Sequence, residues 1–346
     1  MKKLFSIFLI LTLFTSILFI AGCNGDDDDD DNNNDDDSRV LVYEGILGIF
    51  STGSGDVLLH YITPDSYELS TISDEEPKSA AFDYEHSQVC YATRFELYLG
   101  DPETGIFEMV SDGDYEKEER FPAFLRNGRI AYILKHGYDY NNICTFDPNI
   151  SDASLDTLYT AERSTRITQL KASLTGNYLS FIEANYLYCI DLETGDVFNP
   201  NFAGIESYDW ATGGDYMVQY SDYELYWVDV AADSATEILS TTGSNRINDA
   251  AFSPDDSKVA YVIKQSSTES KLYLMNADGT GEAELLIDTA SDGESIRHIA
   301  FSPDGSKIVY YASPMATGAI YVVDIATKEV ETIVDYCENA SELIWN

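Results

Sequence analysis

The sequence predicts an all-β fold, a β-propeller built from four-stranded blades. Two observations support this prediction. Residues 251–262 (AFSPDDSKVAYV) and 300–311 (AFSPDGSKIVYY) repeat one motif, in which a Pro-Asp turn separates two apolar strands. A third apolar strand follows each motif, and weaker copies of the whole unit precede them along the chain. A unit with so little apolar surface must stack on copies of itself, because it cannot bury a core alone.

An aromatic residue closes the first strand of nearly every unit, and we call this position the anchor. Successive anchors lie 38 to 49 residues apart, with one non-aromatic member: Phe82, Phe124, Ala172, Trp210, Phe252, Phe301 and Trp345. A period of about 40–50 residues with four short strands per unit is typical of a propeller blade.

The remaining strands follow each anchor in a fixed order. A turn comes first, and its residues accept a positive φ or preset the first turn position, as in Thr175-Gly176-Asn177 and Pro303-Asp304-Gly305. After the second strand, the third strand recurs as LYLGD (97–101), LYCID (187–191), LYWVD (225–229), LYLMN (272–276) and IYVVD (320–324). A short hairpin then ends each unit.

The two ends of the repeat region complement each other. The chain finishes with Leu343-Ile344-Trp345, which matches a first strand, whereas the first clear match near the start, LLHYIT (58–63), is a third strand. We therefore expect residues 340–346 to complete the blade begun at 40–72 and to close a ring of seven blades, which removes exposed sheet edges. Six or eight blades stay open as alternatives, because residues 38–60 are irregular.

The AFSPDGSKI motif is similar to the repeat of TolB-type propellers, which also occurs in the N-terminal propellers of dipeptidyl-peptidase IV-like enzymes. The resemblance covers residues 40–346, strongly in two repeats and weakly in the others. It implies a scaffold that binds a protein or another ligand. We expect neither a Tol-system role nor peptidase activity, because the chain leaves no room for the extra domains of those proteins.

Residues 1–22 resemble the signal peptide of a bacterial lipoprotein. Lys2 and Lys3 form a positive region, an apolar run follows, and Ala21-Gly22 supply the small residues before Cys23. The resemblance implies that Cys23 is lipidated and becomes the mature N-terminus, with several acyl chains giving a stable anchor. The alternative is an uncleaved membrane helix, although the run is short and is interrupted by serine and threonine.

Residues 23–39 add an acidic tether between this anchor and a single propeller domain at 40–346. The stretch NGDDDDDDNNNDDDS (24–38) cannot form a core, and its like charges extend it. Calcium binding is the alternative, without the glycine-defined loop of a calcium site. The formal charge of the whole chain is −41. This charge argues against nucleic acid or anionic lipid as a partner of the domain surface, so the lipid anchor is the expected membrane contact.

The sequence predicts no catalytic residue, no metal site and no cofactor. The four histidines lack neighbours that suggest a triad or a metal site, and nucleophile-elbow, P-loop and dinucleotide motifs are missing. Enzyme activity is therefore not favoured, although it stays open. Four cysteines besides Cys23 fit small buried residues, with one disulfide as an alternative: Cys90, Cys144, Cys189 and Cys337.

Basic residues are scarce, yet several stand just before the first strand of a blade. Lys78, Arg120 and Arg297 precede their anchors by four residues, and Arg166 and Arg246 precede theirs by six. Because the first strand of a blade is innermost, we expect these cations to ring one mouth of the central channel and to bind an anionic group. The alternative is pairing with nearby acids: Glu116, Glu118, Glu119 and Glu294.

Two aromatic residues add to this candidate surface. Tyr138 and Tyr140 belong to a loop expected at 135–142, on the same face as the cations. The combined prediction is a monomeric, lipid-anchored protein of the bacterial cell envelope, facing the periplasm or the cell surface. Its propeller is expected to be a non-catalytic scaffold for an envelope or extracellular protein or peptide, and a carbohydrate-binding or carbohydrate-cleaving propeller is the alternative.

Overall fold

The structure is a computed structural model, and it describes residues 45–345 with ten short gaps: 53–55, 65, 74–75, 86, 112–116, 137–139, 151–154, 162–164, 201–203 and 315–316. Every regular element in the described residues is an antiparallel β-strand, which confirms the predicted all-β class. The predicted signal peptide, Cys23, the tether and Tyr138 lie outside the described residues. Within them, no helix is long and apolar enough to cross a membrane.

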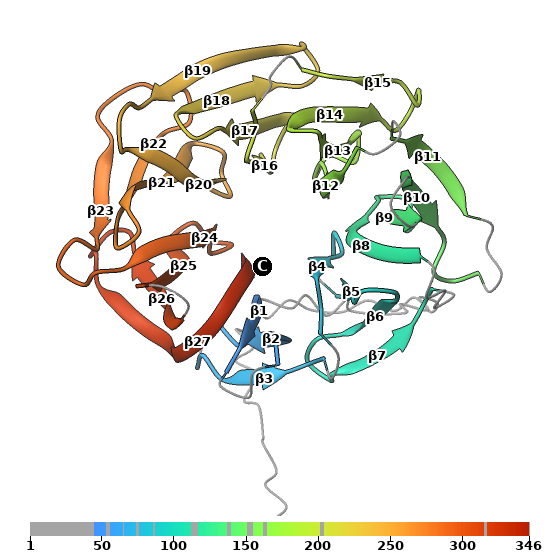
Figure 1. The fold of residues 1–346 in the computed structure, drawn as a ribbon, viewed down its shortest axis with the longest axis horizontal. Coiled ribbons are helices and arrows are strands. Elements are labelled where there is room, and N and C mark those ends of the chain that lie inside the picture. Colours follow the sequence, from blue (N-terminus) through green and yellow to red (C-terminus); the bar gives the residue numbers. More distant parts are fainter. Residues whose placement is uncertain are drawn as a thin grey trace, which may run out of the picture. The chain divides into compact units, whose positions relative to one another are not determined.

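Five four-stranded sheets are arranged around a common axis (Figure 1), each with its first strand innermost. The first contains β4 (Ser79–Phe82), β5 (Val89–Ala92), β6 (Leu97–Asp101) and β7 (Ile106–Met109), and the second contains β8 (Lys117–Phe124), β9 (Ile130–His136), β10 (Tyr140–Phe146) and β11 (Asp156–Thr160). The third contains β12 (Ile167–Ala172), β13 (Tyr178–Glu183), β14 (Tyr186–Asp191) and β15 (Val197–Phe198). The fourth contains β16 (Ser207–Trp210), β17 (Tyr216–Tyr220), β18 (Glu224–Asp229) and β19 (Ser234–Ser240), and the fifth contains β20 (Arg246–Phe252), β21 (Lys258–Ser266), β22 (Glu269–Asn276) and β23 (Glu284–Asp288).

A seven-stranded sheet joins the two ends of the propeller region. Its strands, in spatial order, are β24 (Ser295–Phe301), β25 (Lys307–Ser313), β26 (Thr317–Asp324), β27 (Val330–Trp345), β1 (Ile46–Ser51), β2 (Leu58–Ile62) and β3 (Leu69–Thr71). The first half of β27 pairs with β26, and its second half pairs with β1, from Ser51↔Glu338 to Ile46↔Trp345. One strand is therefore outermost for β24–β26 and innermost for β1–β3.

Strand β1 forms where the sequence looks irregular. All six of its residues, Ile46–Ser51, are buried, so the segment is a continuous apolar run without the alternation of a half-exposed strand. Its position between β27 and β2 makes LLHYIT a third strand, as the sequence predicts. The strand was hard to recognise because both of its faces are covered by protein.

The core lies between neighbouring sheets, and aromatic pairs run through it. The anchors Phe252 and Phe301 are 6% and 7% exposed and pack against residues of the adjacent sheet. Within each of four sheets, an aromatic residue of the second strand stacks on a tyrosine of the third, with ring centroids 5.0 to 5.5 Å apart: Tyr91–Tyr98, Phe181–Tyr188, Tyr261–Tyr273 and Tyr310–Tyr321. Seven of the chain's 25 tyrosines belong to these cross-strand pairs and therefore have a structural role.

The repeated SPD motif builds a turn rather than a ligand site. In the turn after β20, Asp255 accepts hydrogen bonds from the hydroxyls of Ser253 and Ser257, at 2.6 and 2.8 Å. Asp304 does the same with Ser302 and Ser306 in the turn after β24, also at 2.6 and 2.8 Å. Because both serines and the aspartate are needed for this network, the motif repeats as a unit.

The four described cysteines form no disulfide with one another and are buried, each inside a strand: Cys90 in β5, Cys144 in β10, Cys189 in β14 and Cys337 in β27. They behave as small apolar residues of the core, and the alternative of a disulfide among them is wrong.

Candidate functional site

In the five four-stranded sheets and in β24–β26 the first strand is innermost and the pairing is antiparallel, so these first strands begin on one face of the ring (Figure 1). We call this the first-strand face. Lys78 and Arg166 directly precede β4 and β12, Arg246 opens β20, and Arg120 and Arg297 lie in the first halves of β8 and β24. The predicted cations therefore occupy corresponding places in five sheets, and the β16–β19 sheet between β12–β15 and β20–β23 holds none of them. They gather in two groups, with Arg166 apart from both.

The first cationic group lies where the β4–β7 and β8–β11 sheets meet. Lys78 and Arg120 line a pocket of about 510 Å³ together with Arg94 and Phe95, which come from the loop between β5 and β6. Three carboxylates line the same pocket, those of Glu76, Glu96 and Glu118. Arg94 and Phe95 were missed in the sequence, because nothing local marks this loop as a neighbour of β8.

Glu118 is shared by three cations. Its Oε1 accepts from the guanidinium of Arg94 at 3.0 Å, and its Oε2 accepts from Arg120 at 2.7 Å and Lys135 at 3.0 Å. Burial opposes ionisation of Glu118, but the hydrogen bonds from Lys135 and Arg94 and the charge of Arg120 outweigh it and hold its pKa below the ordinary value. The carboxylate is therefore ionised at neutral pH, and the cations around it outnumber it.

The second cationic group lies where the β20–β23 sheet meets β24. Arg246 lies opposite Lys264 in the pairing of β20 with β21. Burial first, and then the charges of Arg297 and Arg246, lower the pKa of Lys264. Arg246 contacts both carboxylate oxygens of Asp222, at 3.0 and 3.1 Å. Among the described residues, no ion pair involves Lys264 or Arg297.

Lys78, Tyr140 and Arg166 complete the set of candidates predicted from the sequence. Lys78 pairs with the exposed Glu76 at 2.9 Å, so pairing with nearby acids applies to part of the ring. Tyr140 opens β10 opposite His136 rather than lying in a loop, because β9 and β10 stay paired to this point. Arg166 precedes β12, in a sheet that contributes to neither cationic group.

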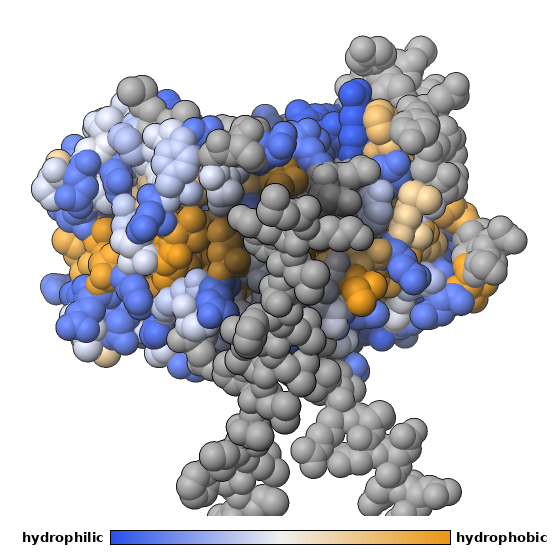
Figure 2. Space-filling model, turned by 90° about the horizontal axis from the view of Figure 1, so that it is seen from below, coloured by the Kyte–Doolittle hydropathy of each residue, from blue (hydrophilic) through white to orange (hydrophobic). Residues whose placement is uncertain are grey.

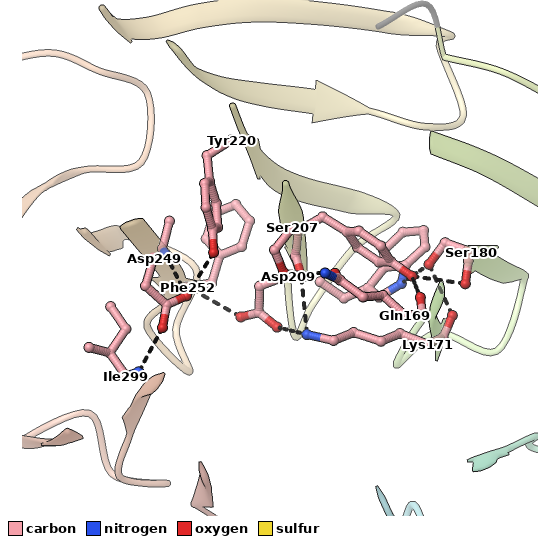
Figure 3. Close-up of polar contacts among 12 residues, drawn as sticks. Gln169, Lys171, Ser180, Ser207, Asp209, Tyr220, Asp249, Phe252 and Ile299 are labelled. Carbon is pink, nitrogen blue, oxygen red and sulfur yellow. Dashed lines mark hydrogen bonds and ion pairs between the residues drawn. The ribbon is translucent and has the colours of Figure 1, made fainter. Parts of the chain in front are cut away.

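A polar cluster that the sequence did not reveal lies among the innermost strands and includes Lys171, Asp209 and Asp249 (Figure 3). The ammonium group of Lys171 contacts Asp209 Oδ1 at 3.4 Å and donates to the backbone oxygen of Tyr208 at 3.0 Å. Asp209 also accepts from the backbone N–H of Phe252 at 3.3 Å, in the next sheet. These contacts join three consecutive innermost strands, β12, β16 and β20.

The residue three positions before the anchor makes a similar tie in several sheets. Ser79 Oγ accepts from Phe121 N at 2.8 Å, Asp249 from Ile299 N at 2.9 Å, and Glu342 from Ala80 N at 3.1 Å. Bulges interrupt the pairing of β8, β12, β20 and β24 near this position. A bulge redirects a side chain from its own sheet, here toward the next one.

Two of these ties are carboxyl groups with raised pKa values. Burial raises the pKa of Asp249 to about 6, against the hydrogen bonds from Ile299 and Ala250. Burial raises the pKa of Glu342 to about 7, against the hydrogen bond from Ala80 and the charge of Lys171. Raised carboxyl pKa values also occur in catalytic sites, but here each group is engaged by a backbone N–H of the adjacent sheet. We therefore infer that Asp249 and Glu342 have a structural role and connect neighbouring sheets.

Metal-binding geometry is not found in the described residues, where no group of three or more histidine, cysteine, aspartate or glutamate side chains is suitably placed. His298 of β24 is an example of a structural histidine. Burial, and then the charge of Arg297, lower its pKa to about 4, and it bonds to the backbone of Ala340. It is therefore neutral and ties β24 to β27.

No protein-family model matches the sequence, and no curated protein matches it. Among solved structures, TolB from Acinetobacter baumannii is similar at a TM-score of 0.54 and 16% identity, over 87% of this chain and 66% of that chain. A prolyl endopeptidase is similar at 0.61 and 14%, over 86% of this chain and 50% of that chain. The fold is that of a TolB-like propeller.

Other propeller proteins share this fold. An oligogalacturonate lyase in complex with manganese is similar at a TM-score of 0.60 and 12% identity, over 85% of this chain and 86% of that chain. The chain spans less than two thirds of the TolB chain and half of the endopeptidase chain. Since proteins with one fold carry out unrelated functions, these similarities settle the architecture, and function must be argued from the residues of this chain.

Proposed function

We propose that this chain is a lipid-anchored protein of the bacterial cell envelope, and that its propeller binds an acidic segment of a protein or peptide partner at the first-strand face, without catalysis. The observation that carries this proposal is the second cationic group. Arg246, Lys264 and Arg297 gather there with Asp222 as the one carboxylate paired to them among the described residues.

The charge of the chain makes this gathering unusual. With a formal charge of −41, most of the surface repels an acidic partner, so a local cationic group both selects the contact point and orients the partner. The three cations repel one another in the free protein, and a carboxylate placed between them would lower their electrostatic energy. An acidic segment therefore fits this face better than any other class of protein surface.

The N-terminal sequence supports the proposed location. Ile20-Ala21-Gly22-Cys23 follows an apolar run, as in lipoprotein signal peptides, and lipidation of Cys23 would supply the anchor. The acidic tether would then separate the propeller from the membrane, since its charges keep it extended.

Capture of a partner from detergent-solubilised envelope tests the proposal. The full chain is compared with Arg246→Ala/Lys264→Ala/Arg297→Ala and with a control of equal charge change, Lys258→Ala/Lys307→Ala/Lys328→Ala. The control residues follow first or third strands and so lie on the opposite face. We expect a partner that the full chain and the control retain and the first variant loses. Equal retention by all three proteins contradicts the proposal.

A further inference from the structure

We propose that the pocket between the β4–β7 and β8–β11 sheets is a site for one carboxylate group of a peptide, held by Arg94 and Lys78 beside the ring of Phe95. This inference rests on the proposed function, because it takes the ligand to be a peptide segment. It goes further by assigning a defined pocket and a chemical group to the first cationic group.

The pocket walls are fixed by backbone hydrogen bonds. Lys78 N donates to Ala92 O at 2.7 Å, which ties the residue before β4 to the end of β5. Glu119 N donates to Arg94 O at 3.1 Å, which ties the β5–β6 loop to β8. Thr93 N donates to Glu96 O at 2.9 Å and closes that loop. The cations are therefore held in place before a ligand arrives, which reduces the entropy lost on binding.

The pocket has cationic hydrogen-bonding capacity left over. Glu118 uses two N–H groups of Arg94 and one of Arg120, whereas each guanidinium carries five N–H groups. Arg120 Nε is buried without a hydrogen-bond partner among the described residues. The side chains of Arg94 and Lys78 are 61% and 36% exposed. Lys78 already pairs with Glu76 at 2.9 Å and Arg94 with Glu118 at 3.0 Å, so a ligand carboxylate would be a second partner for each. Glu118 shows which group this set of donors recognises.

The uncharged part of the lining favours a peptide over an acidic sugar. Phe95 provides an aromatic face, with Arg94 Cζ 4.9 Å from its ring centroid, and can contact an apolar side chain next to the carboxylate. Sugar hydroxyls need neutral polar partners. Among the described residues of the lining, Thr93 has the one neutral polar side chain, and its hydroxyl already bonds to Glu96 at 2.9 Å.

Calorimetric titration of the full chain in detergent micelles tests the site at neutral pH and low salt. The probes are acetyl-Ala-Ala-Phe with a free terminal carboxylate, its terminal amide, acetyl-Asp-Phe-amide and digalacturonate. We expect at least tenfold tighter binding of a carboxylate peptide than of the peptide amide. The two carboxylate peptides show whether the group comes from a chain end or a side chain.

Matched variants locate the binding. Arg94→Gln is expected to weaken the preferred peptide at least tenfold, whereas Arg126→Gln, an exposed arginine of the β8–β9 turn, leaves affinity unchanged. Glu118→Gln removes the internal carboxylate that competes for the same donors and is expected to tighten binding about threefold. Equal loss in the two arginine variants overturns the proposal, as does equal binding of acid and amide, binding of digalacturonate alone, or no binding.

These titrations need no cellular partner, so they separate the two proposals. A peptide that binds through Arg94, with no envelope protein captured, supports the pocket and contradicts the proposed function. If an envelope protein is captured equally well by the Arg94→Gln variant, and none of the peptides binds, the result supports the proposed function and contradicts the proposed carboxylate site.

Discussion

At the scale of single residues, buried carboxyl groups hold neighbouring sheets together. Glu342 belongs to β27 and accepts from Ala80 N in the β4–β7 sheet, although the two residues are 262 positions apart in the chain. Asp249 makes the same kind of contact with Ile299 N. A carboxyl group can accept these bonds whether or not it is ionised, and burial disfavours the ionised form. Because burial outweighs these hydrogen bonds, the two carboxyl groups should make the folded protein more stable in acid, where they are protonated.

The pH dependence of stability follows from the raised pKa of Glu342. Its folded-state pKa is about 7 against an ordinary 4.5, so the folded protein binds more protons between these values and stability falls as pH rises through 7. Glu342→Gln keeps an acceptor without the charge. We expect it to raise the free energy of unfolding by roughly 1–3 kcal/mol at pH 8 and to change little at pH 4.

Denaturant unfolding at the two pH values measures this effect. Glu329→Gln removes the same charge from an exposed position and serves as the control, with little change expected at either pH. A Glu342→Gln variant that is less stable than the wild type at pH 8 would show that the ionised carboxylate stabilises the ring.

At the scale of elements, β27 has the largest structural role, because its first half pairs with β26 and its second half pairs with β1. Its end supplies Leu343, which is 7% exposed in a cluster that also contains Ile46, Phe50 and Val309. These residues come from β1 and β25, so the cluster joins the first and last parts of the propeller region.

Truncation of this side chain tests the role of β27. Leu343→Ala should lower the free energy of unfolding by about 2–5 kcal/mol, since it opens a cavity in a packed cluster. Val330→Ala, at an exposed position of the same strand, should cost less than about 1 kcal/mol. Thermal or denaturant unfolding compares them, and similar losses for the two variants would argue against a special role for the strand end.

Sequence periodicity predicts the strands well because the turns and aromatic positions are local. Periodicity does not reveal the pocket or the polar cluster around Lys171 and Asp209. Arg94 meets Glu118, and Lys171 meets Asp209, only after separate sheets have packed. One signal was available: Asp249, Glu342 and Ser79 share a position three residues before their anchors. Aligning the repeats on the anchors would have marked it. The two cationic groups form between residues that are distant in the sequence, and no local pattern predicts which of them become neighbours.

At the scale of the whole molecule, hydrophobic and hydrophilic residues occupy different parts of the surface. The space-filling view of one side shows a hydrophobic band between two hydrophilic faces (Figure 2). Exposed apolar residues of the outer strands include Ile106 and Met109 of β7. Charged contacts therefore belong to the faces, and the first-strand face carries the two cationic groups.

The proposed lipid anchor concerns the whole chain and can be tested directly at Cys23. Cys23→Ser should abolish incorporation of labelled fatty acid and release the protein from the membrane fraction, because lipidation requires the thiol. Asn34→Ser, in the tether, should retain both. Membrane retention and acylation of the Cys23→Ser protein would contradict lipidation at this residue.

The most direct test of the central claim is hydrogen–deuterium exchange of the full chain, alone and with its captured partner. Binding at the first-strand face predicts slower exchange at the beginnings of β20 and β24 and in the β17–β18 turn that carries Asp222. The turns after β20 and β24, on the opposite face, should be unaffected. Protection confined to those turns, or to the outer strands β7, β19 and β23, would contradict the account.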